Sequence, residues 1–541
     1  MMKKVIKKLL AALLAVAMVC AMAIPAFAYN PGETEEDLNK NHGYIAFQIF
    51  TGVISKDNPK LSNVNWGKNI PHPEDFLEEL RKADRIGPLF ANANSVPDVL
   101  AVISTWDDSD DDSIAFARFV CNYIYTDPLA DSESTIVGGG GAIKIPEPGY
   151  YLIVDNIDIH EDDFYHAYNS FLLVNDTHQG ECNVIINHKV VKPTVEKEVH
   201  DNDNNDISSA GNNDGWGSSA DHAINEKFQF RLIAKLPASK DNGRAYDYYD
   251  KYTVCFNDTL SKGITFDNLD RVEITNGDGG DPKEITDYTL DKDLHEAGLP
   301  SSFKLSIDDV KTCVPDLNKG ATITVTYTAH LNDKAAVNTA DGASNGENKN
   351  SVYLQYSNNP RINTSLDWTP TSEVRVYTYQ LNNTKYHDDD NSNNVLAGAG
   401  FRLYSDKACN AAQEIKLKKN TDGTYSRYFG TEAGDEMISG NDGQFNVKGL
   451  DAGTYYLKET KTPDGYSACD NKEIVISATH DVNHVSLSGN LSNKIINKKA
   501  GGITLPSTGG IGTTLFYVVG GGLMVAAIVL LVTKKRMEHK N

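Results

Sequence analysis

Apolar and polar residues alternate along several stretches in the first third of the chain, which is the pattern of half-buried β-strands. The alternation is clearest at residues 43–52 and returns at 150–154 and 171–174. In residues 74–106 the apolar residues instead recur three or four positions apart, as on one face of an amphipathic helix. The first third is therefore predicted to be a mixed α/β domain.

From about residue 190 to residue 500 the pattern is that of strands alone. The clearest alternating runs, rich in β-branched or aromatic residues, are 228–233, 252–256, 321–327 and 351–356. Clusters of Asn, Asp and Gly separate them, as turns between short strands do. The expected fold class is therefore mainly β, with tandem immunoglobulin-like β-sandwich domains that follow the mixed α/β domain.

Residues 1–28 have the composition of a secretory signal peptide. Lysines within residues 3–8 precede an apolar run at 9–24, and the segment ends in Ala-Phe-Ala. A basic start, an apolar centre and small residues at the end are typical of a cleaved export signal. The exported chain is expected to begin at Tyr29, outside the cytoplasm.

The C-terminal end has the features of a second targeting segment. An uncharged apolar stretch at residues 515–533 is long enough to span a bilayer as a transmembrane helix, and a basic tail follows it. The pentapeptide before this stretch is Leu505, Pro506, Ser507, Thr508 and Gly509. Pentapeptide, apolar span and basic tail resemble the cell-wall sorting signal of Gram-positive surface proteins. The resemblance implies that a sortase cleaves after Thr508, holds that residue as a thioester and attaches the protein to peptidoglycan after a transient membrane stage.

Two extended segments indicate the boundaries between the exported domains: one near residues 190–193, which contains a proline, and one near 377–383, after the turn-rich region at 358–360. Three aspartate-rich stretches, at 107–112, 201–206 and 388–390, are expected to be solvated loops. The predicted organisation is a signal peptide at 1–28, an N-terminal domain at 29–190, a middle domain at 191–380, a third domain at 381–500 and a sorting signal at 501–541.

Charge and hydropathy exclude some classes of function. The chain has 541 residues, a formal net charge of −23 and a mean hydropathy of −0.41. Nucleic-acid binding requires clustered cations, so this balance argues against a nucleic-acid partner. The two terminal segments carry net positive charge, so the exported part is more acidic than the whole chain.

The third domain carries the most specific motif. Residues 455–466 read Tyr-Tyr-Leu-Lys-Glu-Thr-Lys-Thr-Pro-Asp-Gly-Tyr. They follow a predicted strand around Lys385 and precede a last strand around Asn497. This arrangement is similar to the collagen-adhesin B-type (Cna-B) domains of Gram-positive pilins, in which the glutamate motif is called the E-box.

The resemblance implies an intramolecular isopeptide bond between Lys385 and Asn497, assisted by Glu459. Burial in an apolar sandwich lowers the pKa of a lysine, so that its amine can attack, and keeps a carboxyl group protonated. Such a carboxyl group polarises the carboxamide, ammonia leaves, and no cofactor is required. Asn490 and Asn493 lie near the same strand and are the alternative acceptors.

The middle domain looks like the second domain of the same fimbrial backbone family, which also forms an isopeptide bond. By this resemblance Lys197 is the nucleophile, Asp258 the assisting acid and Asn350 the acceptor. Asn358 is the alternative acceptor.

The junction at residues 185–194 lies where backbone pilins carry the lysine that joins subunits. In that family the ε-amine attacks the sortase-held threonine of another subunit. Lys189 is the predicted linkage residue, by its spacing before Pro-Thr, and Lys192 is the alternative.

Six cysteines remain after Cys20 leaves with the signal peptide, two in each exported domain. If they form disulfides, the pairs are Cys121 with Cys182, Cys255 with Cys313, and Cys409 with Cys469; the alternative is that they are buried free thiols. The sequence at 201–212 departs from a calcium-binding loop, since the required glycine and glutamate are absent. No metal or cofactor is predicted.

These features together resemble a sortase-assembled backbone pilin, a structural shaft subunit and not an enzyme. The resemblance implies the following partners: sortase, other copies of the chain in a covalent polymer, ancillary pilins and peptidoglycan. The expected location is the Gram-positive cell wall. The alternative is a wall-anchored adhesin that is displayed singly.

Overall fold

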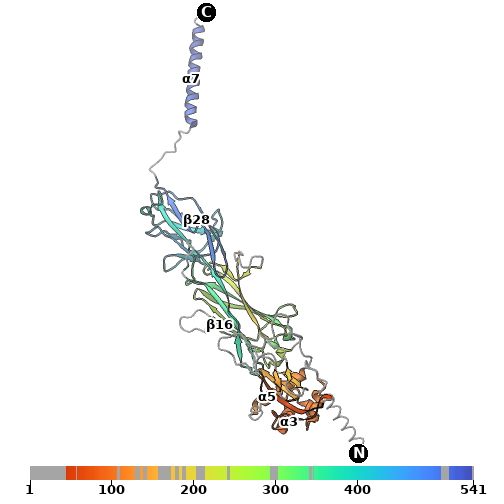
Figure 1. Ribbon diagram of the computed structural model, residues 1–541. Coiled ribbons are helices and arrows are strands. Elements are labelled where there is room, and N and C mark those ends of the chain that lie inside the picture. The colour runs from red at the N-terminus through yellow and green to blue at the C-terminus, as the bar shows by residue number, and fades with distance from the viewer. Residues whose placement is uncertain are drawn as a thin grey trace, which may run out of the picture. The chain divides into compact units, whose positions relative to one another are not determined.

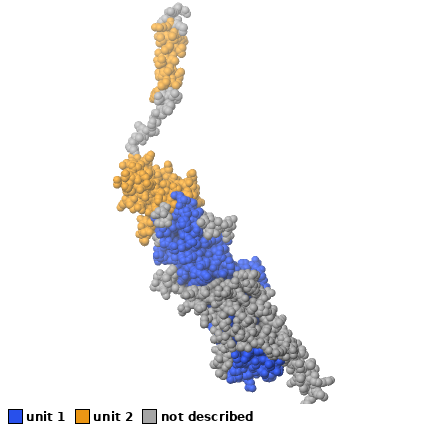
Figure 2. All heavy atoms as spheres, viewed as in Figure 1, with its two compact units in different colours: residues 1–380, 448–453, 476–489 blue, residues 381–447, 454–475, 490–541 orange. Residues whose placement is uncertain are grey.

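The computed structural model describes residues 44–55, 58–106, 110–127, 135–137, 143–145, 147–155, 172–176, 182–184, 191–202, 214–239, 244–292, 302–339, 344, 346–500 and 511–538. The chain divides into two compact units (Figure 2). The first comprises residues 1–380, 448–453 and 476–489, and the second comprises residues 381–447, 454–475 and 490–541.

The first unit begins with an antiparallel sheet in the order β2-β1-β5-β6, with β3 beside β1. Its strands are β1 (Tyr44–Ser55), β2 (Asn58–Trp66), β3 (Thr135–Val137), β5 (Gly149–Asp155) and β6 (Leu172–Asp176). A separate two-stranded sheet joins β4 (Ile143–Ile145) to β7 (Cys182–Val184). The strands expected at 43–52, 150–154 and 171–174 are therefore present.

The described residues of this region also form α3 (Pro73–Lys82), α4 (Val96–Ile103) and α5 (Asp111–Thr126), of which α3 and α5 are labelled in Figure 1. The helix expected from the spacing near residue 76 is confirmed, because Phe76, Leu77 and Leu80 of α3 are buried. These residues share one hydrophobic core with Phe47 of β1 and Val120 of α5. The first part of the unit is thus a mixed α/β structure.

The aspartates at 110–112 correct the expectation of a solvated loop. Asp110 is the N-cap residue of α5, and Asp111 and Asp112 form its first turn. Carboxylates are favourable there because they face the positive end of the helix dipole. Asp111 also pairs with Arg85 at 2.7 Å and with Arg244.

Two sheets, which we call the middle sandwich, are built from the strands of the first unit between Thr194 and Tyr377. One has the order β14-β13-β17-β11-β8-β9, and the other has the order β10-β20-β18-β12-β16-β15, with β19 beside β18. The strands of the first sheet are β8 (Thr194–His200), β9 (Trp216–Gly217), β11 (Lys227–Leu236), β13 (Ile264–Asn276), β14 (Lys283–Glu284) and β17 (Ala321–Leu331). Those of the second are β10 (Ser219–Asp221), β12 (Val254–Leu260), β15 (Thr289–Lys292), β16 (Ser302–Ile307), β18 (Lys349–Ser357), β19 (Leu366–Trp368) and β20 (Ser372–Tyr377).

Both sheets of the middle sandwich contribute to a single apolar core. Phe230 and Val325 come from the first sheet, and Phe256 and Leu354 come from the second. In β11 every second residue is buried, as expected for a strand with one face on the core. The four alternating runs predicted from the sequence correspond to β11, β12, β17 and β18.

The second unit is also built on two sheets. The first has the order β24-β25-β27-β21-β31, with strands β21 (Tyr379–His387), β24 (Leu417–Lys419), β25 (Tyr425–Arg427), β27 (Val447–Leu450) and β31 (Ser492–Asn497). The second has the order β23-β22-β28-β29-β30, with β26 beside β22, and its strands are β22 (Gly400–Tyr404), β23 (Glu414–Ile415), β26 (Met437–Ile438), β28 (Gly453–Lys461), β29 (Lys472–His480) and β30 (Val485–Gly489). Residues 448–453 and 476–489 of these strands belong to the first unit.

The strands at the two ends of the second unit pair with each other in parallel. β21 pairs with β31 from Asn382 opposite Ser492 to His387 opposite Asn497. The loop after β21 is exposed at Asp388, Asp389 and Asp390, as expected from the sequence.

The chain ends in α7 (Ile511–Glu538). Its segment Tyr517–Arg536 has a mean hydropathy of 2.0 and is long and apolar enough to cross a membrane. This agrees with the predicted transmembrane helix and its basic end.

Candidate isopeptide sites and wall anchor

Four polar side chains meet inside the middle sandwich. Lys197 of β8 and Tyr327 of β17 come from one sheet, and Asp258 of β12 and Asn350 of β18 come from the other. All four side chains are buried. They lie at strand positions where the alternation places apolar residues on the core face, so the sequence positions them as it positions the surrounding Val, Leu and Phe.

The tyrosine hydroxyl connects the members of this group. Lys197 Nζ forms an ion pair with Asp258 Oδ2 and also lies 3.1 Å from Tyr327 Oη. The Tyr327 hydroxyl donates to Asp258 Oδ1 at 3.2 Å. Asn350 Nδ2 donates to the same hydroxyl at 2.6 Å. The structure thus brings the predicted nucleophile, acid and acceptor to one point.

The surroundings of this group favour uncharged forms. Burial lowers the pKa of Lys197 to about 8, against the opposing charge of Asp258. Burial likewise raises the pKa of Asp258 above its ordinary value, although Lys197 opposes the shift. Lys197 Nζ also lies 5.3 Å from the ring centre of Phe230. A lysine with a lowered pKa next to a carboxyl group with a raised pKa is the pair that amide formation requires.

The alternative acceptor Asn358 is occupied elsewhere. Its side-chain oxygen accepts a hydrogen bond from the Ser365 hydroxyl at 2.8 Å. Asn350 Oδ1, in contrast, has no hydrogen-bond partner in the described part of the chain. Of the two asparagines, Asn350 is the one that shares a partner, the Tyr327 hydroxyl, with Lys197.

A second group lies between the sheets of the second unit. Lys385 of β21 is buried, and its Nζ lies 2.5 Å from Asn497 Oδ1 of β31. Asn497 Nδ2 donates to Glu459 Oε1 of β28 at 2.7 Å, and the backbone N–H of Cys469 donates to Glu459 Oε2 at 2.8 Å. Burial lowers the pKa of Lys385 below its ordinary value. The order amine, carboxamide, carboxyl is the one expected from the resemblance.

The other two asparagines near the last strand are placed differently. Asn490 is exposed, and its carbonyl oxygen accepts a hydrogen bond from Asn493 Nδ2 at 2.8 Å. Asn493 is buried but pairs in register with Asn383, two residues before Lys385. Only Asn497, of these three, contacts Lys385 in the part of the chain that the structure describes.

Tyr327 is the member of these groups that was not predicted from the sequence. It ends an alternating run of β17 and reads as an ordinary core aromatic residue. A buried tyrosine hydroxyl requires a polar partner, and this requirement could have indicated that Tyr327 lies beside other buried polar residues.

Several predicted sites fall outside the described residues: the signal peptide, Lys189 of the junction, and the pentapeptide Leu505, Pro506, Ser507, Thr508 and Gly509. Lys192, the alternative junction lysine, is described and its side chain is exposed.

The cysteine spacing allowed disulfides, but none is formed at the described positions. Cys121, Cys255, Cys313, Cys409 and Cys469 are free thiols. Burial raises the pKa of Cys121 to about 12 and that of Cys469 to about 11, so both stay protonated at neutral pH. These cysteines are small, mostly buried side chains and not cross-links.

Comparison with known proteins identifies two segments. Residues 382–490 match the SpaA prealbumin-like fold domain, and residues 497–539 match the LPXTG cell wall anchor motif. The expected resemblance is confirmed for these two segments. No curated protein matches the chain.

Solved structures of pilins are similar to the chain. The full-length major pilin SpaD of Corynebacterium diphtheriae is 15% identical, with a TM-score of 0.42, over 85% of this chain and 93% of that one. The T6 backbone pilin of Streptococcus pyogenes is also 15% identical, with a TM-score of 0.42, over 85% of this chain and 96% of that one. The pilus 2b backbone protein of group B streptococcus is 25% identical, with a TM-score of 0.36, over 53% of this chain and 97% of that one.

The segment that matches the anchor motif contains the apolar helix α7, which provides a transient membrane anchor. The prealbumin-like domain directly precedes this anchor along the sequence. The chain is therefore an extracellular, cell-wall-anchored protein that carries a prealbumin-like domain and an LPXTG anchor motif.

Proposed function

We propose that this protein is the structural subunit of a pilus shaft, polymerised by a sortase and reinforced by two intramolecular Lys–Asn isopeptide bonds. The observation that carries the proposal is the contact of Lys385 Nζ with Asn497 Oδ1, inside a domain of the prealbumin-like family that adjoins a wall anchor. A buried amine beside a carboxamide, with a carboxyl group on its far side, has no evident purpose in an inert core.

The chemistry of each bond balances without a cofactor. The neutral lysine amine attacks the side-chain carbonyl carbon of the asparagine, while Glu459 or Asp258 polarises the carboxamide. The C–N bond of the carboxamide breaks, ammonia leaves with a proton from the amine, and a secondary amide remains. The fold holds the two reactants together, which replaces the entropy loss of a bimolecular reaction.

The bond between subunits would use the two ends of the exported chain. Sortase would cleave after Thr508 and transfer its acyl group to a junction lysine of the next subunit. Lys189 is the proposed acceptor, and Lys192, whose side chain is exposed, is the alternative. The only reactions assigned to the protein are its own cross-linking and its use as a sortase substrate.

The test is co-expression of the full chain with the pilus sortase of the organism that produces it. The expected result is a ladder of high-mass polymers that resists boiling in detergent. Thr508→Ala and Lys189→Ala should both abolish the ladder, whereas Lys235→Ala, which removes an exposed lysine of the middle sandwich, should leave it unchanged.

Two outcomes would contradict parts of this proposal. A ladder that survives replacement of both Lys189 and Lys192 would exclude the junction assignment. Wild-type chain that reaches the wall but never polymerises would favour the alternative, a singly displayed adhesin.

A further inference from the structure

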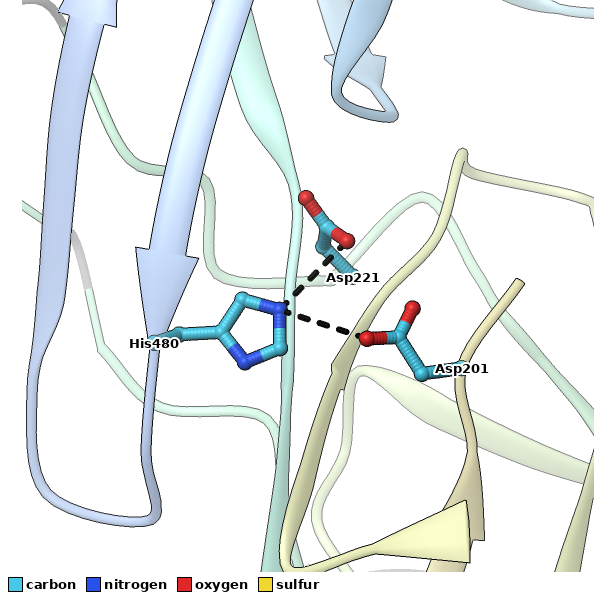
Figure 3. Close-up of side chains that lie close together, drawn as sticks. All are labelled: Asp201, Asp221 and His480. Atoms are coloured by element: carbon cyan, nitrogen blue, oxygen red, sulfur yellow. Dashed lines mark hydrogen bonds and ion pairs between the residues drawn. The ribbon is translucent and has the colours of Figure 1, made fainter. Parts of the chain in front are cut away.

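Three metal-ligating side chains from distant parts of the sequence meet within the first unit. Asp201 follows β8, Asp221 ends β10, and His480 ends β29 in the hairpin segment at 476–489. Figure 3 shows the imidazole of His480 pointing at both carboxylates. His480 and Asp221 are fully buried, and Asp201 is 4% exposed, so the aspartate expected in a solvated loop is instead a core residue.

The distances among the ligand atoms are those of a small metal site. His480 Nε2 lies 3.4 Å from Asp221 Oδ1 and 3.8 Å from Asp201 Oδ2. The three ligand atoms all lie within 4.8 Å of one another. Zinc with tetrahedral bonds of about 2.0–2.1 Å places its ligand atoms roughly 3.3 Å apart. A small movement of the Asp201 carboxylate toward His480 would give this spacing.

A serine fixes the orientation of the imidazole. Ser219 Oγ lies 2.8 Å from His480 Nδ1, on the side of the ring opposite the carboxylates. With Nδ1–H donating to this hydroxyl, the lone pair of Nε2 faces two carboxylate oxygens, an arrangement that a cation at Nε2 stabilises. Metal-binding histidines are commonly held through their other ring nitrogen in this way.

The charge of the cluster also calls for a cation. Two buried carboxylates surround one imidazole, and buried charges are costly unless they are paired. Asp221 Oδ2 has no hydrogen-bond partner among the described residues, and no described Lys or Arg forms an ion pair with Asp221. A fully buried carboxylate with an unused oxygen therefore belongs to the cluster.

The donor set selects the class of ion. Calcium and magnesium prefer oxygen ligands alone, whereas an imidazole nitrogen with carboxylate oxygens suits first-row transition ions. A second group in the same unit, His222, Glu226 and Asp451, is less suitable. There His222 Nε2 already faces the carbonyl oxygen of His200 at 2.7 Å, and Glu226 accepts from the backbone N–H of Ala223 at 3.1 Å.

We propose that Asp201, Asp221 and His480 bind a divalent first-row transition ion of the zinc type, with an open position for water. The ion joins the hairpin at 476–489 to the ends of β8 and β10 within the first unit. The hairpin is already held there by Tyr377, whose hydroxyl donates to the carbonyl oxygen of Asp481 at 2.9 Å. The proposal is independent of the isopeptide chemistry.

The test is calorimetric titration of Zn²⁺ into the exported chain, residues 29–508, after treatment with a chelator. We expect one ion per chain, and a tetrahedral Co²⁺ absorption band when Co²⁺ replaces it. Asp221→Asn and His480→Gln should each weaken zinc binding about a hundredfold, and Ser219→Ala about tenfold. His484→Ala changes an exposed histidine of the same hairpin and should have no effect.

A thermal measurement separates binding from folding. Zinc should raise the unfolding temperature of the wild-type chain and of His484→Ala, and leave that of Asp221→Asn and His480→Gln unchanged. Absence of zinc binding by the wild-type chain would overturn the proposal. So would one-to-one binding that persists in both variants, or calcium binding that does not depend on His480.

Discussion

The Tyr327 hydroxyl and the Asn350 side-chain nitrogen lie 2.6 Å apart, although they come from opposite sheets of the middle sandwich. The nitrogen is the atom that leaves as ammonia when the proposed bond forms. The same hydroxyl contacts Lys197 and Asp258. Tyr327 therefore connects the amine that must lose a proton to the leaving group that must gain one.

Tyr327→Phe should slow formation of the Lys197–Asn350 bond about tenfold or more, because a positioned proton donor and acceptor is lost while the ring remains. The rate is measured by intact mass while chain recovered unfolded and not yet cross-linked from inclusion bodies is folded, since each bond releases ammonia, about 17 Da. Tyr353→Phe, on the other face of β18, is the matched control. An unchanged rate would exclude a role for the Tyr327 hydroxyl.

The two proposed bonds should be separable by mass. The exported chain is expected to be about 34 Da lighter than its sequence, because two molecules of ammonia are lost. Lys197→Ala or Asp258→Ala should restore about 17 Da, and Lys385→Ala or Glu459→Ala the other 17 Da, after correction for the substitution. A wild-type mass equal to that of the sequence would contradict both bonds.

The bond in the second unit should contribute strongly to stability. Lys385 and Asn497 are 112 positions apart, and a cross-link that closes a loop of about 100 residues stabilises a fold by roughly 4–5 kcal/mol in the chain-entropy treatment. Lys385→Ala and Asn497→Ala should therefore lower the free energy of unfolding of this unit by similar amounts in urea titrations. Lys494→Ala, an exposed change on β31, should have little effect, and an equal loss in that control would argue against a cross-link.

Formation of the Lys197 bond should depend on pH through the shared proton of the pair. Burial lowers the pKa of Lys197 to about 8 and raises that of Asp258 above its ordinary value. The reactive state, a neutral amine beside a protonated carboxyl group, holds the same number of protons as the ion pair. Its share therefore does not change with pH, and the rate stays constant, as long as Lys197 and Asp258 together keep that proton. Above pH 8 the proton leaves, the acid is lost, and the rate falls.

Lys385→Ala chain, in which only one bond can form, is recovered unfolded and not yet cross-linked from inclusion bodies; its folding at pH 5 to 10, followed by intact mass, checks this profile. A decrease of about tenfold per pH unit is expected well above pH 8. At acid pH, below the raised pKa of Asp258, a second proton blocks the amine and the rate also falls. A rate that rises steadily to pH 10 would mean that the carboxyl group does not act as an acid.

The thiols should be unreactive in the folded chain and fully available after unfolding. Burial raises the pKa of Cys121 to about 12 and that of Cys469 to about 11, so few thiolates exist at pH 8. Alkylation with iodoacetamide should label neither residue in the native chain and both in denaturant without reductant. Failure to label them in denaturant would indicate disulfides.

The sequence predicted the strands, and it singled out Lys385 and Asn497, which the structure brings into contact, because both depend on local pattern. Lys385 and Asn497 lie on inward positions of their strands, and the motif around Glu459 identifies the domain type. Polar residues at such positions stand out against an apolar alternation. The alternation alone could not choose among Asn490, Asn493 and Asn497, because that choice depends on the parallel register of β21 and β31.

The parts not predicted depend on contacts between distant segments. Asp201 belongs to an aspartate-rich stretch that reads as a loop, yet it is buried beside His480. Asp111 reads as loop as well, but it begins α5 and faces Arg244. Local composition indicates how exposed a segment is on average. It cannot identify a single residue of that segment that is buried by contact with a distant part of the chain.

The parallel pairing of β21 with β31 has a mechanical consequence. A wall-anchored chain pulled from its N-terminal side receives tension at the start of β21 and passes it on from the end of β31. The two strands are then loaded in shear, so their hydrogen bonds must break together and not one after another. A Lys385–Asn497 link across this pair would carry the tension directly. The 112 positions between its ends, about 380 Å if fully extended, would then not unfold and lengthen under load.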